Sequence, residues 1–168
     1  TVTGVQTCAL PISGVGYMDV KSNTLAGNSL IDVERDTIDS VFAKPKSESD
    51  FHAIASGEVK YTLGGRGTQF FLGGGIEDIV TLDLAQGLGL RQDIGETGNV
   101  ELAVLFSGIP AEVWEDPYVE GAPRRETDRD STGARFRWDR IFGSDFEFEV
   151  VYRDVEIDTE RSGEFLDL

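Results

Sequence analysis

Apolar and polar residues alternate with a period of two over most of this chain. In residues 53–63 every odd-numbered side chain is apolar, small or aromatic, and in residues 52–62 all but one of the even-numbered side chains are polar. A β-strand places successive side chains on opposite faces, whereas a helix repeats every 3.6 residues and does not separate them in this way. The alternation therefore predicts strands that each have one apolar and one polar face.

The same alternation recurs along the chain. It marks residues 14–21 weakly and residues 69–77, 80–91, 99–107, 134–139 and 146–153 clearly. With residues 53–63 these segments predict about seven strands, most of them near the ~9–11 residues that cross a bilayer at a tilt. Residues 164–168 begin a further strand, and residues 37–42 are expected to form one helical turn.

Short and long connections alternate between the predicted strands. Residues 64–67, 77–79, 93–98 and 143–145 form short turns, whereas residues 22–51 and 110–132 are long and polar. Both long connections follow odd-numbered strands, so they lie at one rim of the sheet, as in transmembrane barrels. A soluble β-sandwich or lipocalin-like barrel also alternates, but its apolar face points inward.

The two predicted faces differ in their chemistry. The polar face carries both signs of charge, as a wet lumen does, and the apolar face carries aromatic residues towards the strand ends, as an aromatic girdle does. The candidate lumen-lining residues are Glu58, Lys60, Asp83, Arg91, Glu101, Arg135, Arg137, Asp139, Glu147, Glu149 and Arg153. The candidate membrane-interface aromatics are Tyr61, Phe106, Trp138, Phe142 and Tyr152. The predicted fold class is all-β: an antiparallel transmembrane β-barrel, here an incomplete piece of about seven strands.

The overall charge excludes one class of partner. The chain has 15 Lys and Arg against 31 Asp and Glu, which gives a formal net charge of −16. Nucleic acid is therefore not an expected partner, because phosphate binding needs clustered Lys and Arg. No apolar run reaches the roughly 20 residues of a transmembrane helix.

Three segments carry a resemblance to a known family. Residues 57–91, 111–129 and 142–163, with Val-Trp-Glu-Asp-Pro-Tyr at residues 113–118 as the most specific part, resemble an uncharacterised Gram-negative outer-membrane β-barrel family, domain of unknown function 2860. The resemblance implies export, an outer-membrane location, and contact with membrane lipid and lipopolysaccharide. It offers no activity, catalytic residue or cofactor.

The first residues resemble something else. Residues 2–12, VTGVQTCALPI, resemble the conceptual translation of a sequencing-adapter oligonucleotide. We therefore expect residues 1–12 to be an artefact and residues 13–168 to be a partial outer-membrane barrel domain, a metagenomic fragment truncated at both ends. The only cysteine, Cys8, lies in this segment, so no thiol chemistry is expected.

Few residues suggest chemistry. His52 is the only histidine, and it is interpreted as a surface or rim residue because no partner for a zinc site or a catalytic triad is evident. Asp128, Asp130 and residues 154–158 lack the spacing of a calcium-binding loop, so they are interpreted as solvated acidic loops. No catalytic residue, metal site or cofactor is predicted, and an enzyme is not expected.

Opposite charges share the predicted polar face. Arg135, Arg137 and Arg153 lie on it with Glu147 and Glu149. Such ladders either produce a transverse field that selects polar or charged solutes, or form a salt-bridge network that plugs a narrow barrel. Both interpretations stay open.

The long connection at residues 110–132 is also open to two interpretations. It either folds over or into the pore mouth, or packs locally on its own aromatics, and the second is favoured. The candidate external-loop residues are Trp114, Glu115, Asp116, Tyr118, Arg124 and Arg125.

Three functions fit these patterns. The first is an outer-membrane barrel that passively passes or binds small polar solutes. The second is a structural or surface-interaction barrel with no transport role, and the third is a soluble periplasmic barrel that binds an apolar ligand. The isolated chain is expected to form a curved, incomplete sheet with open edges and to aggregate.

Overall fold

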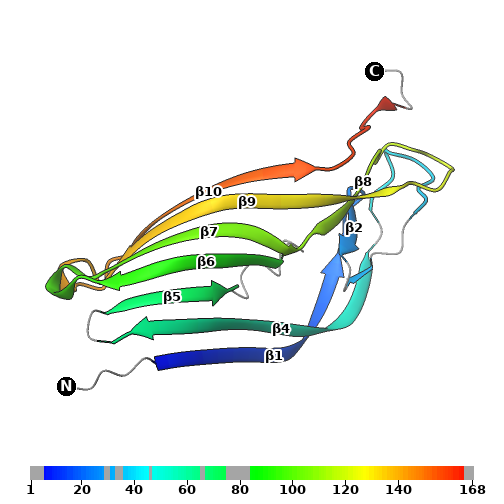
Figure 1. Ribbon diagram of the computed structural model, residues 1–168. Coiled ribbons are helices and arrows are strands. Elements are labelled where there is room, and N and C mark those ends of the chain that lie inside the picture. The colour runs from blue at the N-terminus through cyan, green and yellow to red at the C-terminus, as the bar shows by residue number, and fades with distance from the viewer. Residues whose placement is uncertain are drawn as a thin grey trace.

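The protein forms one antiparallel β-sheet that curls into a half-barrel (Figure 1). The computed structural model describes residues 6–28, 31–32, 36–45, 47–64, 67–74 and 84–164. The wall consists of β1 (Gln6–Val20), β4 (Glu48–Leu63), β5 (Thr68–Gly73), β6 (Leu84–Asp93), β7 (Asn99–Ile109), β9 (Glu126–Asp139) and β10 (Phe148–Ile157). Each of these strands pairs with the next, so β1 and β10 form the two edges of the wall. The predicted all-β antiparallel sheet of about seven strands, curved and incomplete, is confirmed.

Short elements lie at the two ends of this wall. The long-loop end carries β2 (Leu25–Asn28), β3 (Ile31–Asp32) and β8 (Ala111–Trp114). The opposite end carries the tight turns, two of which contain the single 3-10 turns η2 (Gly95–Thr97) and η3 (Ile141–Gly143). Among the described residues, no helix is long and apolar enough to span a membrane.

Several predicted boundaries were wrong. β1 begins at Gln6 rather than residue 14, because residues 6–13 pair with β4, and its edge position tolerates Pro11. β4 begins at Glu48, so His52 lies within a strand and not at its junction with a loop, and the His52 side chain is outside the described part. β9 begins at Glu126 rather than residue 134, because its first residues pair with β8.

One predicted element does not form, and two others lie where the structure makes no statement. Residues 37–42 do not form a helical turn, because Ile38 makes a parallel β-bridge with Glu120, and only a single turn follows, in which the Ala43 N–H donates to the Ser40 carbonyl at 3.1 Å. The predicted turn at residues 77–79 lies outside the described residues. So does the predicted strand at residues 164–168, apart from Glu164.

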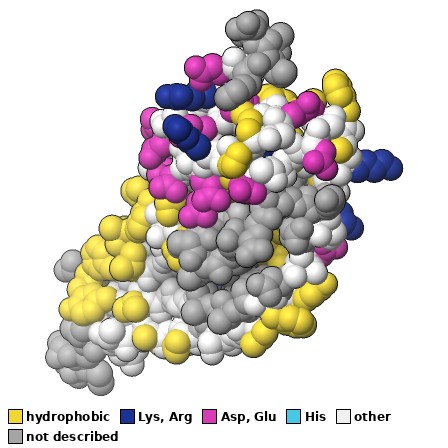
Figure 2. Space-filling model, turned by 90° about the vertical axis from the view of Figure 1, so that its right-hand side faces the viewer, with side chains coloured by type: hydrophobic (Ala, Val, Ile, Leu, Met, Phe, Trp, Pro, Cys, Tyr) yellow, Lys and Arg dark blue, Asp and Glu magenta, His cyan; other side chains and the backbone are white. Residues whose placement is uncertain are grey.

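The two faces of the sheet have opposite environments. In β7, Glu101 and Leu105 are buried, whereas Leu102 and Val104, on the other face, are 56% and 59% exposed. Side chains converge on the inside of a curved sheet and diverge on its outside, so the buried face is the concave one. Figure 2 shows hydrophobic side chains along the outer flanks of the molecule and acidic and basic side chains gathered at its top. The half-barrel is therefore apolar outside and largely polar inside.

Candidate functional site: the charged concave face

Glu101 is the centre of an ion-pair network on the concave face. It is buried on β7, in register with Arg91 on β6 and Arg137 on β9. Arg135 Nη2 donates a hydrogen bond to Glu101 Oε1 at 2.8 Å, and Arg91 Nε lies 3.7 Å from Glu101 Oε2. A buried carboxylate is costly unless cations neutralise it, and here the two flanking strands each supply one.

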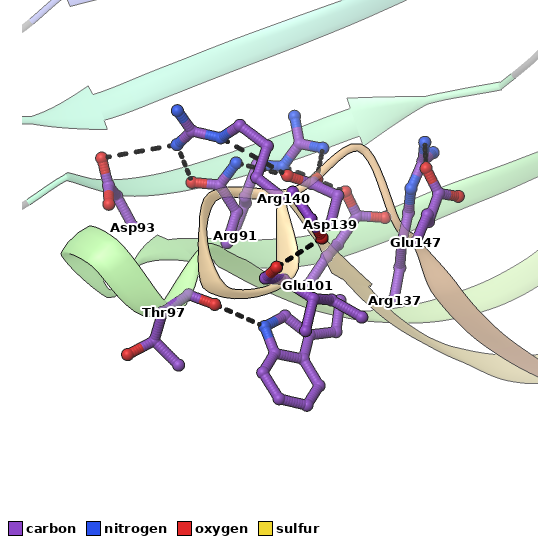
Figure 3. Close-up of polar contacts among 12 residues, drawn as sticks. Arg91, Asp93, Thr97, Glu101, Arg137, Asp139, Arg140 and Glu147 are labelled. Atoms are coloured by element: carbon purple, nitrogen blue, oxygen red, sulfur yellow. Dashed lines mark hydrogen bonds and ion pairs between the residues drawn. The ribbon is translucent and has the colours of Figure 1, made fainter.

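The network continues to Asp139 near the tight turns. Arg91 Nη2 donates to Asp139 Oδ2 at 2.7 Å, although β7 lies between their strands. Asn99 on β7 lies between these two strands and joins the network. Its Nδ2 donates to Asp139 Oδ1 at 2.5 Å, and its Oδ1 accepts from Arg140 Nη2 at 2.9 Å. Figure 3 shows Arg91, Glu101, Asp139 and Arg140 gathered together. Charged side chains thus link β6, β7 and β9 across the inside of the wall.

Further pairs extend the charged surface towards both edges. Arg137 Nη2 donates to Glu147 Oε2 at 2.6 Å, and Lys60 Nζ lies 2.6 Å from Glu58 Oε1 (Figure 3 for the first pair). Register places Glu149 opposite Arg137 and Arg153 opposite Gly133, so both share this face. All the candidate lumen-lining residues thus lie on one face except Asp83, which is outside the described residues. The ten described candidates comprise five acidic and five basic side chains, so their charges cancel.

An apolar patch adjoins the network, and the sequence pattern did not single it out. Phe71, Ala103 and Leu105 form a buried cluster on the concave face. Phe71 lies opposite Gly89, and a Cβ atom built on Gly89 would be 2.5 Å from its ring. The alternation could have revealed it, because Phe71 is an aromatic residue at a position of the polar face, where its neighbours on β5 and β6 are glycines. The inside of the wall therefore combines charged and apolar surface.

The arginines of the network keep unused donor capacity. The Nε atoms of Arg91, Arg135 and Arg137 are buried and have no hydrogen-bond partner within the described ranges. Most buried polar atoms in proteins do find partners. These donors are therefore unsatisfied within the described wall, although Arg91 Nε lies 3.7 Å from Glu101 Oε2.

Sequence comparison assigns a family to this arrangement. The chain matches the family described as "Protein of unknown function (DUF2860)" over residues 11–168. The chain belongs to DUF2860. This confirms the family that the resemblance indicated, and the family's description names no activity. A search of the curated proteins and a search of the solved structures each returned no match.

The candidate interface aromatics of this DUF2860 chain lie on the convex face or in a tight turn. Tyr61, Phe106 and Tyr152 point outward and are exposed. Trp138 packs edge-on against Phe142, with ring centroids 5.7 Å apart, and its Nε1 donates to the Thr97 carbonyl at 3.0 Å. Both lie at the tight-turn end, so aromatic side chains occur near both ends of the apolar face.

The candidate external-loop residues of the DUF2860 fold are divided between core and surface. Trp114, Asp116 and Arg124 are buried, Glu115 is half-buried, and Tyr118 and Arg125 are exposed. The Arg124 guanidinium lies 4.2 Å from the Trp114 ring centroid, which is a cation–π contact. Asp116 accepts hydrogen bonds from the backbone N–H groups of Tyr118 at 2.9 Å and Gly163 at 3.2 Å. The second long connection is therefore packed around a buried Trp–Arg pair.

In the described part of this DUF2860 chain, no group of three or more His, Cys, Asp or Glu side chains is placed to hold a metal ion. Cys8 is exposed on β1.

Proposed function

We propose that this chain is part of an outer-membrane β-barrel of a Gram-negative bacterium, which passes or binds small polar solutes through a charged lumen. The observation that carries the proposal is the polarity of the wall, which is charged and buried inside but apolar and exposed outside. A bilayer solvates such an outer face, and membrane barrels alternate in this sense. A soluble barrel that holds an apolar ligand would have the reverse polarity, so the convex face argues against that alternative.

The limits of the apolar face support a membrane location. On β10, outward-facing Phe148, Val150 and Tyr152 are followed by Asp154, and on β1 outward-facing Tyr17 is followed by Asp19. In each case an aromatic side chain comes directly before the first outward carboxylate. Aromatic residues favour the boundary between hydrocarbon and water.

The chemistry of the concave face supports polar solutes. Its ten described candidate side chains balance in charge, which favours polar or zwitterionic molecules over a strong selection for one sign of charge. The side chains of Arg91, Arg135 and Arg137 are partly exposed and offer donors for carboxylate or hydroxyl oxygens. We propose that passage is passive.

A second candidate is a surface-interaction barrel with no transport role. The specific observation in its favour is the packed long-loop end, where buried Trp114 and Arg124 give the loops a defined shape. Ordered loops on a rigid scaffold commonly carry recognition. The ion pairs of Glu101 would then serve to fill the barrel and not to line a pore.

Conductance of the complete barrel tests the first candidate against the second. The full-length protein from the parent gene is refolded into detergent and inserted into planar bilayers. Discrete, salt-dependent steps are expected. Arg135→Gln should increase cation over anion permeability because Glu101 keeps its charge, whereas Arg125→Gln, at an exposed loop site, should not.

Two outcomes would contradict the channel. A folded, heat-modifiable barrel that does not conduct would favour the surface-interaction candidate. Native protein recovered without any detergent would contradict both membrane candidates.

We also infer that residues 2–12 are adapter-encoded. The family match begins at Pro11, which leaves the first ten residues outside it. Pairing of residues 6–12 with β4 is compatible with this inference, because backbone hydrogen bonds at an open sheet edge make few demands on side chains. The parent gene is expected to encode different residues before Ser13, and the same codons there would contradict the inference.

A further inference from the structure

At the long-loop end the chain leaves one edge of the half-barrel and joins the wall again several strands away. β1 is separated from β7 by β4, β5 and β6 in the sheet. β2 begins soon after β1 ends, yet it pairs with β8, which follows β7 after Pro110. We call residues 21–28 the strap. Figure 1 shows β2 and β8 together at the end opposite the tight turns.

Arg124 is the main side chain that holds the strap. Its Nη1 donates to the Asn23 carbonyl at 2.8 Å, while its Nε and its backbone N donate to the Asp36 carbonyl at 3.4 and 2.7 Å. Its guanidinium also stacks on Trp114 of β8. One buried cation thus joins the two long connections, although about a hundred residues separate Asn23 from Arg124 in sequence.

Backbone contacts between the strap and β8 are few. Leu25 pairs with Val113, Gly27 with Glu112 and Asn28 with Ala111, with an irregularity between the first two pairs. The Trp114 N–H donates to the Thr24 carbonyl at a long 3.4 Å. A four-residue strand held in this way opens at a small fraction of the global unfolding free energy.

The strap region is buried differently from the wall. In β7 the outward residues are exposed, but in β8 both Val113 and Trp114, which have opposite parity, are buried. Ala26 of the strap is also buried. A wall strand in contact with lipid or water on its outside would not be covered on both faces. The strap and the second long connection therefore form a layer around β8 at the end of the barrel.

We propose that the strap is a removable cover over the long-loop mouth of the channel, and that Arg124 is the positioning residue that holds it closed. The inference rests on the proposed function. Without the guanidinium, the Asn23 carbonyl loses its donor, the Asp36 carbonyl keeps only the Arg124 backbone N–H, and Trp114 loses its stacking partner. The strap then opens while the wall strands, which pair along their full length, stay in place.

The test compares Arg124→Ala with Arg125→Ala in the complete barrel. Arg125 is the exposed neighbour, so its replacement is a matched control for loss of charge. Two quantities are measured: bilayer conductance, and the rate of trypsin cleavage after Lys21, which adjoins Ser22 in the strap. Arg124→Ala should raise cleavage at least about tenfold, since it removes the guanidinium hydrogen bonds to the Asn23 and Asp36 carbonyls and the contact with Trp114, and should raise conductance severalfold. Arg125→Ala should behave as the parent protein.

A disulfide separates opening of the strap from misfolding of the barrel. Leu25→Cys with Val113→Cys joins a directly opposed antiparallel pair, whose spacing suits a disulfide. Added to Arg124→Ala, the oxidised bridge should restore slow cleavage and low conductance, and reduction should reverse both.

The two proposals fail in different ways. Rapid cleavage in Arg124→Ala with parental conductance would overturn the cover and leave the channel standing. Unchanged cleavage would overturn the role of Arg124. A barrel that conducts in no variant, although its strap is cleaved freely, would contradict the proposed channel itself.

Discussion

At the scale of single residues, glycine on the concave face makes room for an aromatic ring. Phe71 is buried on β5 and lies opposite Gly89 of β6. A Cβ atom on Gly89 would lie 2.5 Å from both the Phe71 ring and the Leu102 carbonyl oxygen. The ring therefore occupies the space over the glycine. Aromatic residues opposite strand glycines stabilise sheets in this way.

Gly89→Ala is expected to destabilise the barrel by about 1–3 kcal/mol, because the methyl group overpacks a site whose neighbours include backbone. Urea unfolding in detergent micelles measures the change. The control is Gly14→Ala on β1, where a Cβ atom would meet no heavy atom within 4 Å, and a change within about 0.5 kcal/mol is expected. Equal effects of the two substitutions would show that Phe71 does not lie over Gly89.

At the scale of elements, β7 and β8 show what the sequence could predict. The faces of β7 follow from its alternation, because parity along a strand does not depend on which strand lies beside it. β8 was not predicted; it pairs with β9 on one edge and with β2, far away in sequence, on the other. Its burial on both faces also removes the alternation that would have revealed it.

The candidate site was predictable to the same extent. The polar face could be assigned to one side of the sheet, but not its pairs. Glu101 lies in register with Arg137, yet its hydrogen bond comes from Arg135, while Arg137 bonds Glu147. Partner choice depends on side-chain reach across a curved surface, which a linear pattern does not contain. Arg124 was predicted only as an external-loop residue. Its burial could not be predicted, because Trp114 and the carbonyl groups that it contacts are brought to it by the folding of distant segments.

The two tryptophans of the chain report on two different elements. Trp138 ends β9 on the outward side near the tight turns, and Trp114 is buried at the end of β8. In vesicles that contain brominated lipid, Trp138 in a Trp114→Phe variant should lose much of its fluorescence, because outward aromatics lie at the membrane boundary. Trp114 in a Trp138→Phe variant should keep nearly all of it. Strong quenching of Trp114 with none of Trp138 would place the membrane against the long-loop end of the wall and contradict a lipid boundary near the tight turns.

At the scale of the whole molecule, the edge of the apolar face runs obliquely across the strands. Each strand residue has a partner directly opposite on the next strand. When these partners are followed from Tyr152 on β10 across the sheet, the last one is Ala9 on β1. The outward aromatic edge on β1 is nevertheless Tyr17, eight residues further along (17 − 9 = 8). A flat slab of lipid around a barrel of tilted, staggered strands produces this offset. A sheet that only packed against another protein layer would have no need of it.

The same geometry allows one substitution to separate a membrane barrel from a soluble one. Val104 is outward near the middle of the apolar face, and Asp154 is outward beyond its aromatic edge. Val104→Arg should cost about 2–4 kcal/mol of folding into lipid bilayers, whereas Asp154→Arg should cost about 0–1 kcal/mol, because the cost of a cation depends on its depth. Urea titration of folding into vesicles, followed by heat-modifiable mobility, measures both. The two variants introduce the same side chain on the same face, so they differ mainly in position along the barrel.

In a soluble barrel both positions are plain surface, where changes within about 0.5 kcal/mol are the norm. Equal, small effects would therefore contradict the membrane location, and a loss confined to Val104→Arg would place β7 in the hydrocarbon.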